Sequence, residues 1–320
     1  MVTTRRAPAA ERARAAAMAF STLSGDEQGI ILGQLRSTLE PRLVMYFSSA
    51  SKELRALLPP AARRQLRADY KKATALCRKV GMQSCKELRE AKNVCKRVYW
   101  YDKGLSAVDL ATLAKLGSVL PALEELRLDV RSGSASPDGV QRLAEGLVSG
   151  SLPAVTYLSI NAMHVGDAGA SALAAALERG ALPRLKSLSL CSAAIGDAAL
   201  AALAPALRRR PALEKLILGA NPLGYEGLAA LLAPPPPAAG TPPPPAGGLK
   251  KLKMLDLGFT RISDAGCAIL AAALDSGALP ALEELHLPCT HASTAAREAV
   301  FAALTRSSGA ARSWFGLMCR

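Results

Sequence analysis

The sequence LPRLKSLSLCSAAIGDAALAALAPALRRR, residues 182–210, contains the unit from which most of this chain is built. Leu188 and Leu190 alternate with small polar residues, which predicts a short strand with one buried face. In the second half, leucines recur on one face at helical spacing, at Leu200, Leu203 and Leu207. One strand and one helix are too small to bury their own apolar faces, so the unit must stack on copies of itself.

Copies of this unit follow one another along the last two-thirds of the chain. The opening Leu-Pro dipeptide begins at residues 120, 152, 182 and 279, with variants at 210 and 249, so successive units start 32, 30, 28, 39 and 30 residues apart. Each copy carries a pair of apolar strand residues, and an earlier, weaker copy adds a seventh: Val98/Trp100, Leu126/Leu128, Leu158/Ile160, Leu188/Leu190, Leu216/Leu218, Leu255/Leu257 and Leu285/Leu287. The spacing predicts seven stacked units over residues 93–320.

Residues typical of a helix start recur with the same period. Six residues after the second strand residue, a Ser or Gly suits a helix N-cap, at Ser106, Gly166, Gly196, Gly224, Ser263 and Ser293. An aspartate follows directly in three copies, where the helix dipole favours a carboxylate, at Asp167, Asp197 and Asp264. A merely leucine-rich sequence would not produce this pattern, so the repeat is structural.

With these motifs the chain resembles the leucine-rich repeat proteins of the ribonuclease-inhibitor type, whose units have about 28–30 residues. The resemblance implies an α/β solenoid, or horseshoe, with a parallel sheet on its concave side and helices on its outer side. The family's Asn just after the strand occurs here only as Asn221, with Lys103, Arg131, Met163, Ala193, Thr260 and Thr290 in the other copies. A continuous ladder of buried Asn side chains is therefore not expected.

Composition limits the class of protein. The chain has 320 residues and a formal net charge of +14. Residues 1–92 contain 18 Lys/Arg and 8 Asp/Glu, which gives +10, and the remaining 22 and 18 give +4. Seven scattered cysteines without a Cys-x-x-Cys motif, no secretory signal and no membrane-spanning apolar run predict a reduced protein of the cytoplasm or nucleus.

The N-terminal third divides into a tail and a helical domain. Residues 1–20 are rich in Ala and Arg and are interpreted as a basic disordered tail, with an organelle transit peptide as the alternative. Residues 21–92 are expected to form a helical domain. Within it, three short helices interrupted by Glu40-Pro41 resemble the F-box, the docking module of cullin-type ubiquitin ligases. That resemblance implies docking of the ligase's small adaptor subunit through Leu23, Ile30, Ile31, Leu35 and Pro41.

The alternative for these helices is a generic cap that covers the open end of the solenoid. The F-box pattern has Pro where this chain has Ser24, and its late aromatic is missing here.

Residues 60–94 are basic on one helical face and apolar on the other, which usually means a solvated surface. No nucleic-acid partner is expected, although the clustered charge leaves that alternative open. The proline-rich residues 234–248 are interpreted as an insertion between a helix and a strand.

No catalytic constellation is present in the sequence. His286, Cys289 and His291 lie close together, but no local fourth ligand completes a structural zinc site. The Gly-Asp-Ala-Gly sequence at 166–169 is a helix start inside the repeat and does not form a phosphate-binding loop. We therefore expect no enzyme activity, no metal and no cofactor.

The predicted functional surface is the concave face, made of strand residues that alternate with the core leucines. Its first half combines tyrosines, arginines and acids, the residue types that dominate protein interfaces. The candidate partner-binding residues are Arg97, Tyr99, Tyr101, Glu125, Arg127, Asp129, Tyr157, Ser159 and Asn161. The middle of the face carries small residues, so a protein partner is expected at the first end.

Together these resemblances imply a substrate-recognition adaptor of a cullin-type ubiquitin ligase, in which the concave face selects a protein substrate. Two alternatives use the same solenoid. One is a scaffold or sensor with no ligase contact. The other is a Ran-type GTPase-activating protein, for which Arg131 lies in a suitable strand-to-helix turn.

Overall fold

The computed structural model describes residues 22, 59–82, 97–117, 120, 123–129, 138–232 and 248–308. The chain forms two compact units, residues 1–91 and 92–320, which are described separately. The predicted docking residues Leu23, Ile30, Ile31, Leu35 and Pro41 lie outside the described residues, as do Arg131 and nearly all of the proline-rich insertion. Within the described residues, no helix has the length and apolar character needed to cross a membrane.

In the first unit the described element is the helix α5, Pro60–Lys79. Proline at its first position suits a helix start, because the first N–H groups of a helix have no partner within it. One face of α5 is buried and carries Leu66, Ala73, Leu76 and Cys77, whereas lysines and arginines occupy the other face.

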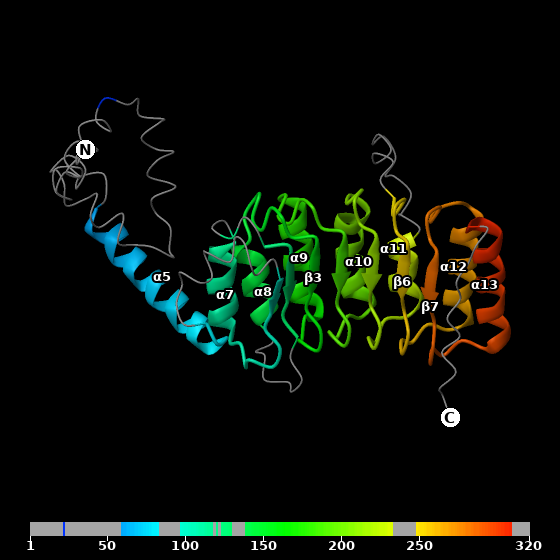
Figure 1. Ribbon diagram of the computed structural model, residues 1–320. Coiled ribbons are helices and arrows are strands. Elements are labelled where there is room, and N and C mark those ends of the chain that lie inside the picture. Colours follow the sequence, from blue (N-terminus) through cyan, green and yellow to red (C-terminus); the bar gives the residue numbers. More distant parts are fainter. Residues whose placement is uncertain are drawn as a thin grey trace, which may run out of the picture. The chain divides into compact units, whose positions relative to one another are not determined.

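Among its described residues, the second unit is a repeat solenoid of seven parallel strands and seven helices. The strands are β1 (Arg97–Tyr99), β2 (Glu125–Arg127), β3 (Tyr157–Ser159), β4 (Ser187–Ser189), β5 (Lys215–Ile217), β6 (Met254–Asp256) and β7 (Glu284–His286). The helices are α7 (Ala107–Leu116), α8 (Gly139–Gly146), α9 (Gly166–Glu178), α10 (Asp197–Arg208), α11 (Tyr225–Leu232), α12 (Asp264–Asp275) and α13 (Thr294–Ser308). The strands pair in chain order, and the helices form a second layer (Figure 1). The predicted leucine-rich repeat fold is confirmed.

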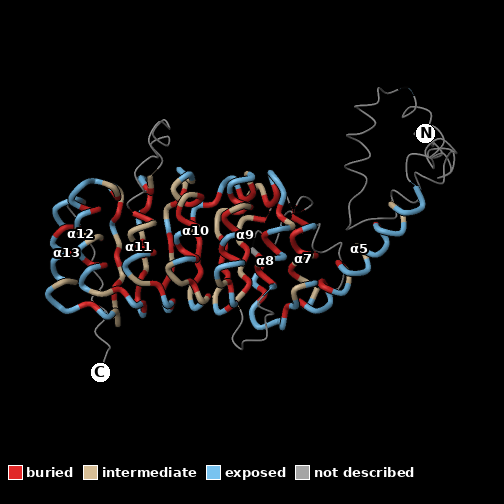
Figure 2. The backbone as a smooth tube through the Cα atoms, turned by 180° about the vertical axis from the view of Figure 1, so that it is seen from behind, coloured by how far each residue is buried: buried red, intermediate tan, exposed pale blue. Residues whose placement is uncertain are grey.

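Strand register aligns the leucines of every unit. Leu188 pairs with Leu158 on one side and with Leu216 on the other, and the same position is occupied by Val98, Leu126, Leu255 and Leu285 in the other strands. These side chains are at most 5% exposed. Burial follows the strands and the inward sides of the helices, whereas exposed positions lie on the outer sides (Figure 2). A single core therefore runs through all the units, as expected for a solenoid.

Six of the seven strands are followed by a residue in the left-handed backbone conformation. The third residue after the strand has φ between 49° and 58° in six units, at Asp102, Ala162, Ser192, Ala220, Phe259 and Cys289. Its N–H donates to a carbonyl of the next unit in the first five of these, for example from Ala220 to the Gly258 oxygen at 2.7 Å. The backbone ladder between units therefore extends past the strands, and this extension accounts for a conformation that non-glycine residues rarely adopt.

Asn221 forms the one fully connected side-chain bridge at its repeat position among the described units. Its Oδ1 accepts from the N–H groups of Ala193 and Ile195 at 2.9 and 3.0 Å. Its Nδ2 donates to the carbonyls of Leu190, Leu218 and Gly219 at 2.7, 2.8 and 3.2 Å. At the same position, Thr260 donates to a carbonyl of its own unit, Leu257, at 2.6 Å. Thr290 likewise donates to the Leu287 carbonyl of its own unit at 3.4 Å, so the two threonines at this position satisfy their own turns and do not bridge units.

The predicted helix starts are correct in most units. Ser106 and Asp109 form a reciprocal capping box, and Gly196 and Ser263 are the N-cap residues of α10 and α12. The assignment of Gly166 as an N-cap is wrong, because α9 begins at Gly166 itself and Val165 precedes it. There the N–H of Gly169 already bonds to the Val165 carbonyl, which starts the helical ladder one residue earlier.

First-turn aspartates also cap the neighbouring unit, a role that the sequence did not reveal. Asp197 Oδ1 accepts from the N–H groups of Gly224 and Gly227 at 2.7 and 2.9 Å. Asp264 Oδ1 accepts from the N–H of Ser293 at 2.6 Å. Each carboxylate therefore satisfies N–H groups at the start of the next helix, where the helix dipole favours negative charge.

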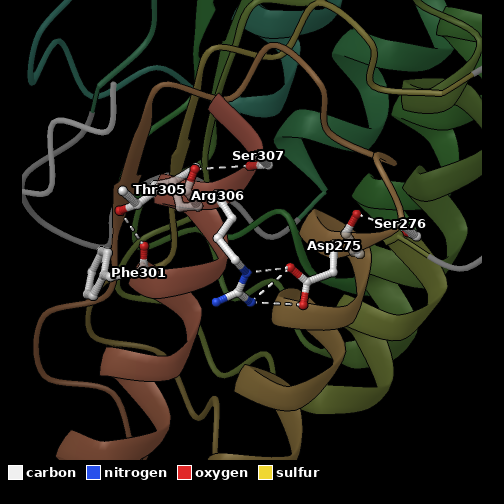
Figure 3. A network of polar contacts seen from close by, with 8 residues as sticks. Asp275, Ser276, Phe301, Thr305, Arg306 and Ser307 are labelled. Atoms are coloured by element: carbon white, nitrogen blue, oxygen red, sulfur yellow. Dashed lines mark hydrogen bonds and ion pairs between the residues drawn. The ribbon is translucent and has the colours of Figure 1, made fainter. Parts of the chain in front are cut away.

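Ion pairs join neighbouring helices on the outer side of the solenoid. Arg306 of α13 donates to both carboxylate oxygens of Asp275 in α12, at 2.9 and 3.1 Å (Figure 3). Arg209 donates to one carboxylate oxygen of Glu178, at 2.9 Å. Arg179 instead donates to the Ala144 and Leu147 carbonyls at the end of α8. Arg210 donates to the Leu177 carbonyl in the last turn of α9 and to those of Ala181 and Leu182 just after it, and burial lowers the pKa of Arg210. These contacts place positive charge where the helix dipole is negative.

The cysteines differ from the sequence-based expectation of a fully reduced chain. Cys77, Cys191 and Cys267 are not disulfide-bonded. Cys289, in the turn after β7, is disulfide-bonded.

Candidate functional site: the open face of the sheet

The face of the sheet that carries no helices is formed by the first and third residue of each strand and by the residue two positions further on. We call this surface the open face. Eight of the nine predicted partner-binding side chains are described, and all eight come from β1, β2, β3 and the two residues that follow each strand. For Arg97 the structure describes the backbone in β1 only. The parallel register brings these positions together because Tyr99 lies opposite Arg127, and Glu125 lies opposite Tyr157.

Arg127 is the centre of this end of the open face. Its guanidinium carbon lies 4.8 Å from the ring centroid of Tyr99 and 4.5 Å from that of Tyr157. A guanidinium within about 6 Å of a ring face is attracted to it, so both rings hold the side chain in place. Arg127 Nη2 also lies 3.6 Å from Glu125 Oε2, which accepts a hydrogen bond from the Tyr99 hydroxyl at 3.0 Å. We call Tyr99, Glu125, Arg127 and Tyr157 the arginine cluster.

The arginine cluster is held in place yet accessible. Tyr99 and Tyr101 are each 46% exposed, and the Arg127 side chain is 39% exposed. The Arg127 Nε is buried and has no hydrogen-bond partner among the described residues. Because the planar guanidinium is already oriented, little side-chain entropy is lost when a partner's carboxylate or carbonyl binds its exposed edge.

Asp129, Ser159 and Asn161 form a polar ladder beside the cluster. Ser159 Oγ donates to Asp129 Oδ1 at 2.6 Å, and the Asn161 N–H donates to the same oxygen at 3.3 Å. Asn161 Oδ1 in turn accepts from Ser189 Oγ at 2.8 Å and from the Cys191 N–H at 2.9 Å. Ser159 is fully buried, so this predicted contact residue instead positions Asp129.

The rest of the open face differs in chemistry from the arginine cluster. No large side chain projects from its middle at β4, because Ser187 and Ser189 are small and buried. Further along, Lys215 is exposed, and His286 Nδ1 lies 4.0 Å from Asp256 Oδ2. On the open face, the exposed tyrosine and guanidinium groups therefore gather at the β1–β3 end.

The titratable side chains of the described residues are not gathered into a metal site. In this part of the chain no three His, Cys, Asp or Glu side chains are grouped to hold a metal ion. Cys289 is disulfide-bonded, so the triplet of His286, Cys289 and His291 lacks its thiolate. Burial, with a contribution from Asp264, raises the pKa of the Cys267 thiol, which makes it a poor nucleophile at neutral pH.

The sequence did not reveal that Arg127 stacks between two tyrosines. The signal was nevertheless available in the repeat register. Tyr99 and Arg127 are the third strand residues of adjacent units, and Tyr157 is the first strand residue of the following one. Aligning the units places these three side chains on one face and next to one another, because residues i and i+2 of a strand share a face.

No protein-family model and no curated protein matches this sequence. Among solved structures, an internalin from Listeria monocytogenes is 16% identical with a TM-score of 0.36, and the alignment covers 65% of this chain and 51% of the internalin. Actin-binding site 2 of leiomodin-1 is 16% identical with a TM-score of 0.36, with 62% of this chain and 88% of that chain covered. This chain therefore spans about half the length of the internalin.

Proposed function

We propose that this chain is a non-catalytic protein-binding scaffold that holds a protein partner against the β1–β3 end of its open face. The observation that carries this proposal is the arginine cluster, in which two tyrosine rings hold a partly exposed guanidinium. Tyrosine and arginine are the residues that most often dominate the energy of a protein interface. Exposed and pre-oriented side chains of these types fit a binding surface better than a purely structural role.

Replacing Tyr99, Arg127 and Tyr157 together with Ala is expected to weaken binding of the protein partner at least about 30-fold, equivalent to about 2 kcal/mol. The partner is first identified by affinity purification with the full chain, and its dissociation constant is then measured with purified proteins. Arg127→Lys separates charge from shape, because lysine keeps the positive charge but loses the planar stacking. It is expected to weaken binding as well.

Lys215→Ala is the matched control, since Lys215 is an exposed cation of β5 on the same open face. It should leave the dissociation constant unchanged. If the triple variant binds as wild type does while Lys215→Ala binds weakly, the partner occupies the other end of the face and the assignment to the arginine cluster is wrong.

The ligase role rests on the sequence resemblance of residues 23–58 to the F-box. In this proposal Leu23, Ile30, Ile31, Leu35 and Pro41 dock the small adaptor subunit of a cullin-type ligase, and the open face selects the substrate. The full chain should then co-purify with that adaptor subunit. The double variant Ile30→Asp, Ile31→Asp should lower the amount of adaptor subunit recovered at least about 10-fold, because charges replace apolar docking groups.

The same purification distinguishes the alternatives. Recovery of other proteins without the adaptor subunit identifies a scaffold that has no ligase contact. Recovery of a small GTPase, lost on Arg131→Ala, identifies the GTPase-activating alternative. The control is the arginine-cluster variant, in which Tyr99, Arg127 and Tyr157 are replaced by Ala. It should retain the adaptor subunit while losing the substrate.

A further inference from the structure

The helix α5 carries a basic stripe along its exposed side. Seven of its 20 residues are Lys or Arg and one, Asp69, is acidic. With about 100° of rotation per residue, Arg64, Arg67, Lys71 and Arg78 lie within about 60° of one another around the helix axis. All four are exposed. The stripe extends over about 21 Å, from Arg64 to Arg78.

The one acidic residue of α5 lies on the other side of the helix from this stripe. Asp69 accepts hydrogen bonds from Gln65 at 3.0 and 3.1 Å, and a rotation of about 100° per residue places it about 160° around the helix axis from Lys71. Within the part of the chain that the structure describes, no ion pair involves Arg64, Arg67, Lys71 or Arg78. The first 92 residues carry a net charge of +10, so the wider unit reinforces the positive potential of the stripe.

The opposite face of α5 argues against a membrane as the partner. A helix that lies in a membrane interface inserts its apolar face among the lipids. In α5 that face carries Leu66, Ala73, Leu76 and Cys77, which are at most 8% exposed. The apolar side is already buried within the protein, and the side that remains offers only charge.

We infer that α5 binds the phosphate backbone of duplex DNA without reading its sequence. Duplex DNA presents one negative charge per about 1.7 Å of its axis, or about 12 charges over the length of the stripe. Single strands are usually gripped by stacked aromatic side chains, whereas the one aromatic residue of α5, Tyr70, is half-buried. The wide major groove of B-form DNA admits a helix of this diameter, unlike the narrow one of duplex RNA.

The test measures binding of the full chain to a fluorescein-labelled 20-base-pair DNA duplex by fluorescence anisotropy. With four phosphate contacts, affinity should fall about 100-fold between 50 and 200 mM salt. The variant R64Q/R67Q/K71Q should bind at least about 10-fold more weakly at 50 mM salt. Its salt slope should be shallower by about 2.7, because three contacts are lost. Glutamine is a good helix former, so the helix is retained.

The matched control is K250Q/K251Q/R261Q, which removes three exposed cations of the solenoid and should bind DNA as wild type does. The arginine-cluster variant should also bind DNA normally, so this result is independent of the proposed function. The inference is overturned if the wild-type chain does not bind the duplex at 50 mM salt, or if the α5 variant binds equally well. Displacement of the DNA by polyglutamate at a charge concentration far below that of the DNA would show a preference for carboxylates, and would overturn the inference in favour of an acidic protein partner.

Discussion

Replacing Asn221 with Ala is expected to lower the free energy of unfolding by about 3 kcal/mol or more, a large share of the stability of an ordinary domain. The side chain is 2% exposed and makes five hydrogen bonds to backbone groups of two adjacent units. Without it, the N–H groups of Ala193 and Ile195 are buried without a partner. An unsatisfied buried polar group costs about 1–3 kcal/mol, so two such groups account for the expected loss.

Urea unfolding followed by circular dichroism measures this loss, and hydrogen exchange locates it. The amides of Ala193 and Ile195 should exchange faster in the variant than other amides of their unit. Asn161→Ala is the control, since Asn161 bridges adjacent units through fewer bonds and is only half-buried. Its effect should be about 1 kcal/mol. Equal losses in the two variants would contradict the role assigned to the buried bridge.

The importance of Asn221 also shows which parts of the fold are readable from sequence. The leucine pairs and the turn residues recur at a fixed spacing, so they predict strands, helices and their stacking without any knowledge of contacts. Asn221 is a single departure from the pattern of its neighbours, and sequence alone does not say which carbonyls and N–H groups it meets. Those partners are set by the register between units.

The same reasoning applies to the helix starts and to the open face. Asp197 was recognised as a first-turn residue of its own helix, but its hydrogen bonds go to Gly224 and Gly227 of the next unit. Likewise, Tyr99, Arg127 and Tyr157 were each assigned to the open face from their alternation with leucines. Their stacking depends on how three strands align, so it emerges only when the units are placed side by side.

Glycines at the helix interfaces set how closely neighbouring units approach. A Cβ added to Gly227 would lie 2.7 Å from Asp197 Oδ1 and 3.0 Å from Asp197 Cα. A Cβ added to Gly146 would lie 2.6 Å from the Ala114 Cβ. At these two interfaces a small residue therefore permits the tight packing of helix on helix, whereas the leucines supply the core between helix and sheet.

Leu188→Ala is expected to lower the free energy of unfolding by about 2–5 kcal/mol, because it removes buried methyl groups and leaves a cavity in a close-packed core. Leu188 is fully buried in the central strand β4, with Leu158 and Leu216 on its two sides. A solenoid is stabilised by contacts between neighbouring units, so damage in a central unit weakens two interfaces. The loss should therefore lie toward the upper end of this range.

Leu285→Ala tests that reasoning with the same substitution at the same repeat position. Leu285 is also fully buried, but β7 pairs with β6 alone in the sheet. Damage there weakens one interface, so urea unfolding should show a smaller loss than for Leu188→Ala, by about 1 kcal/mol or more. If the two losses were equal, the stability of each unit would not depend on having neighbours on both sides. If Leu188→Ala caused no loss of unfolding free energy, the assignment of the middle strand leucines to the buried core would be wrong.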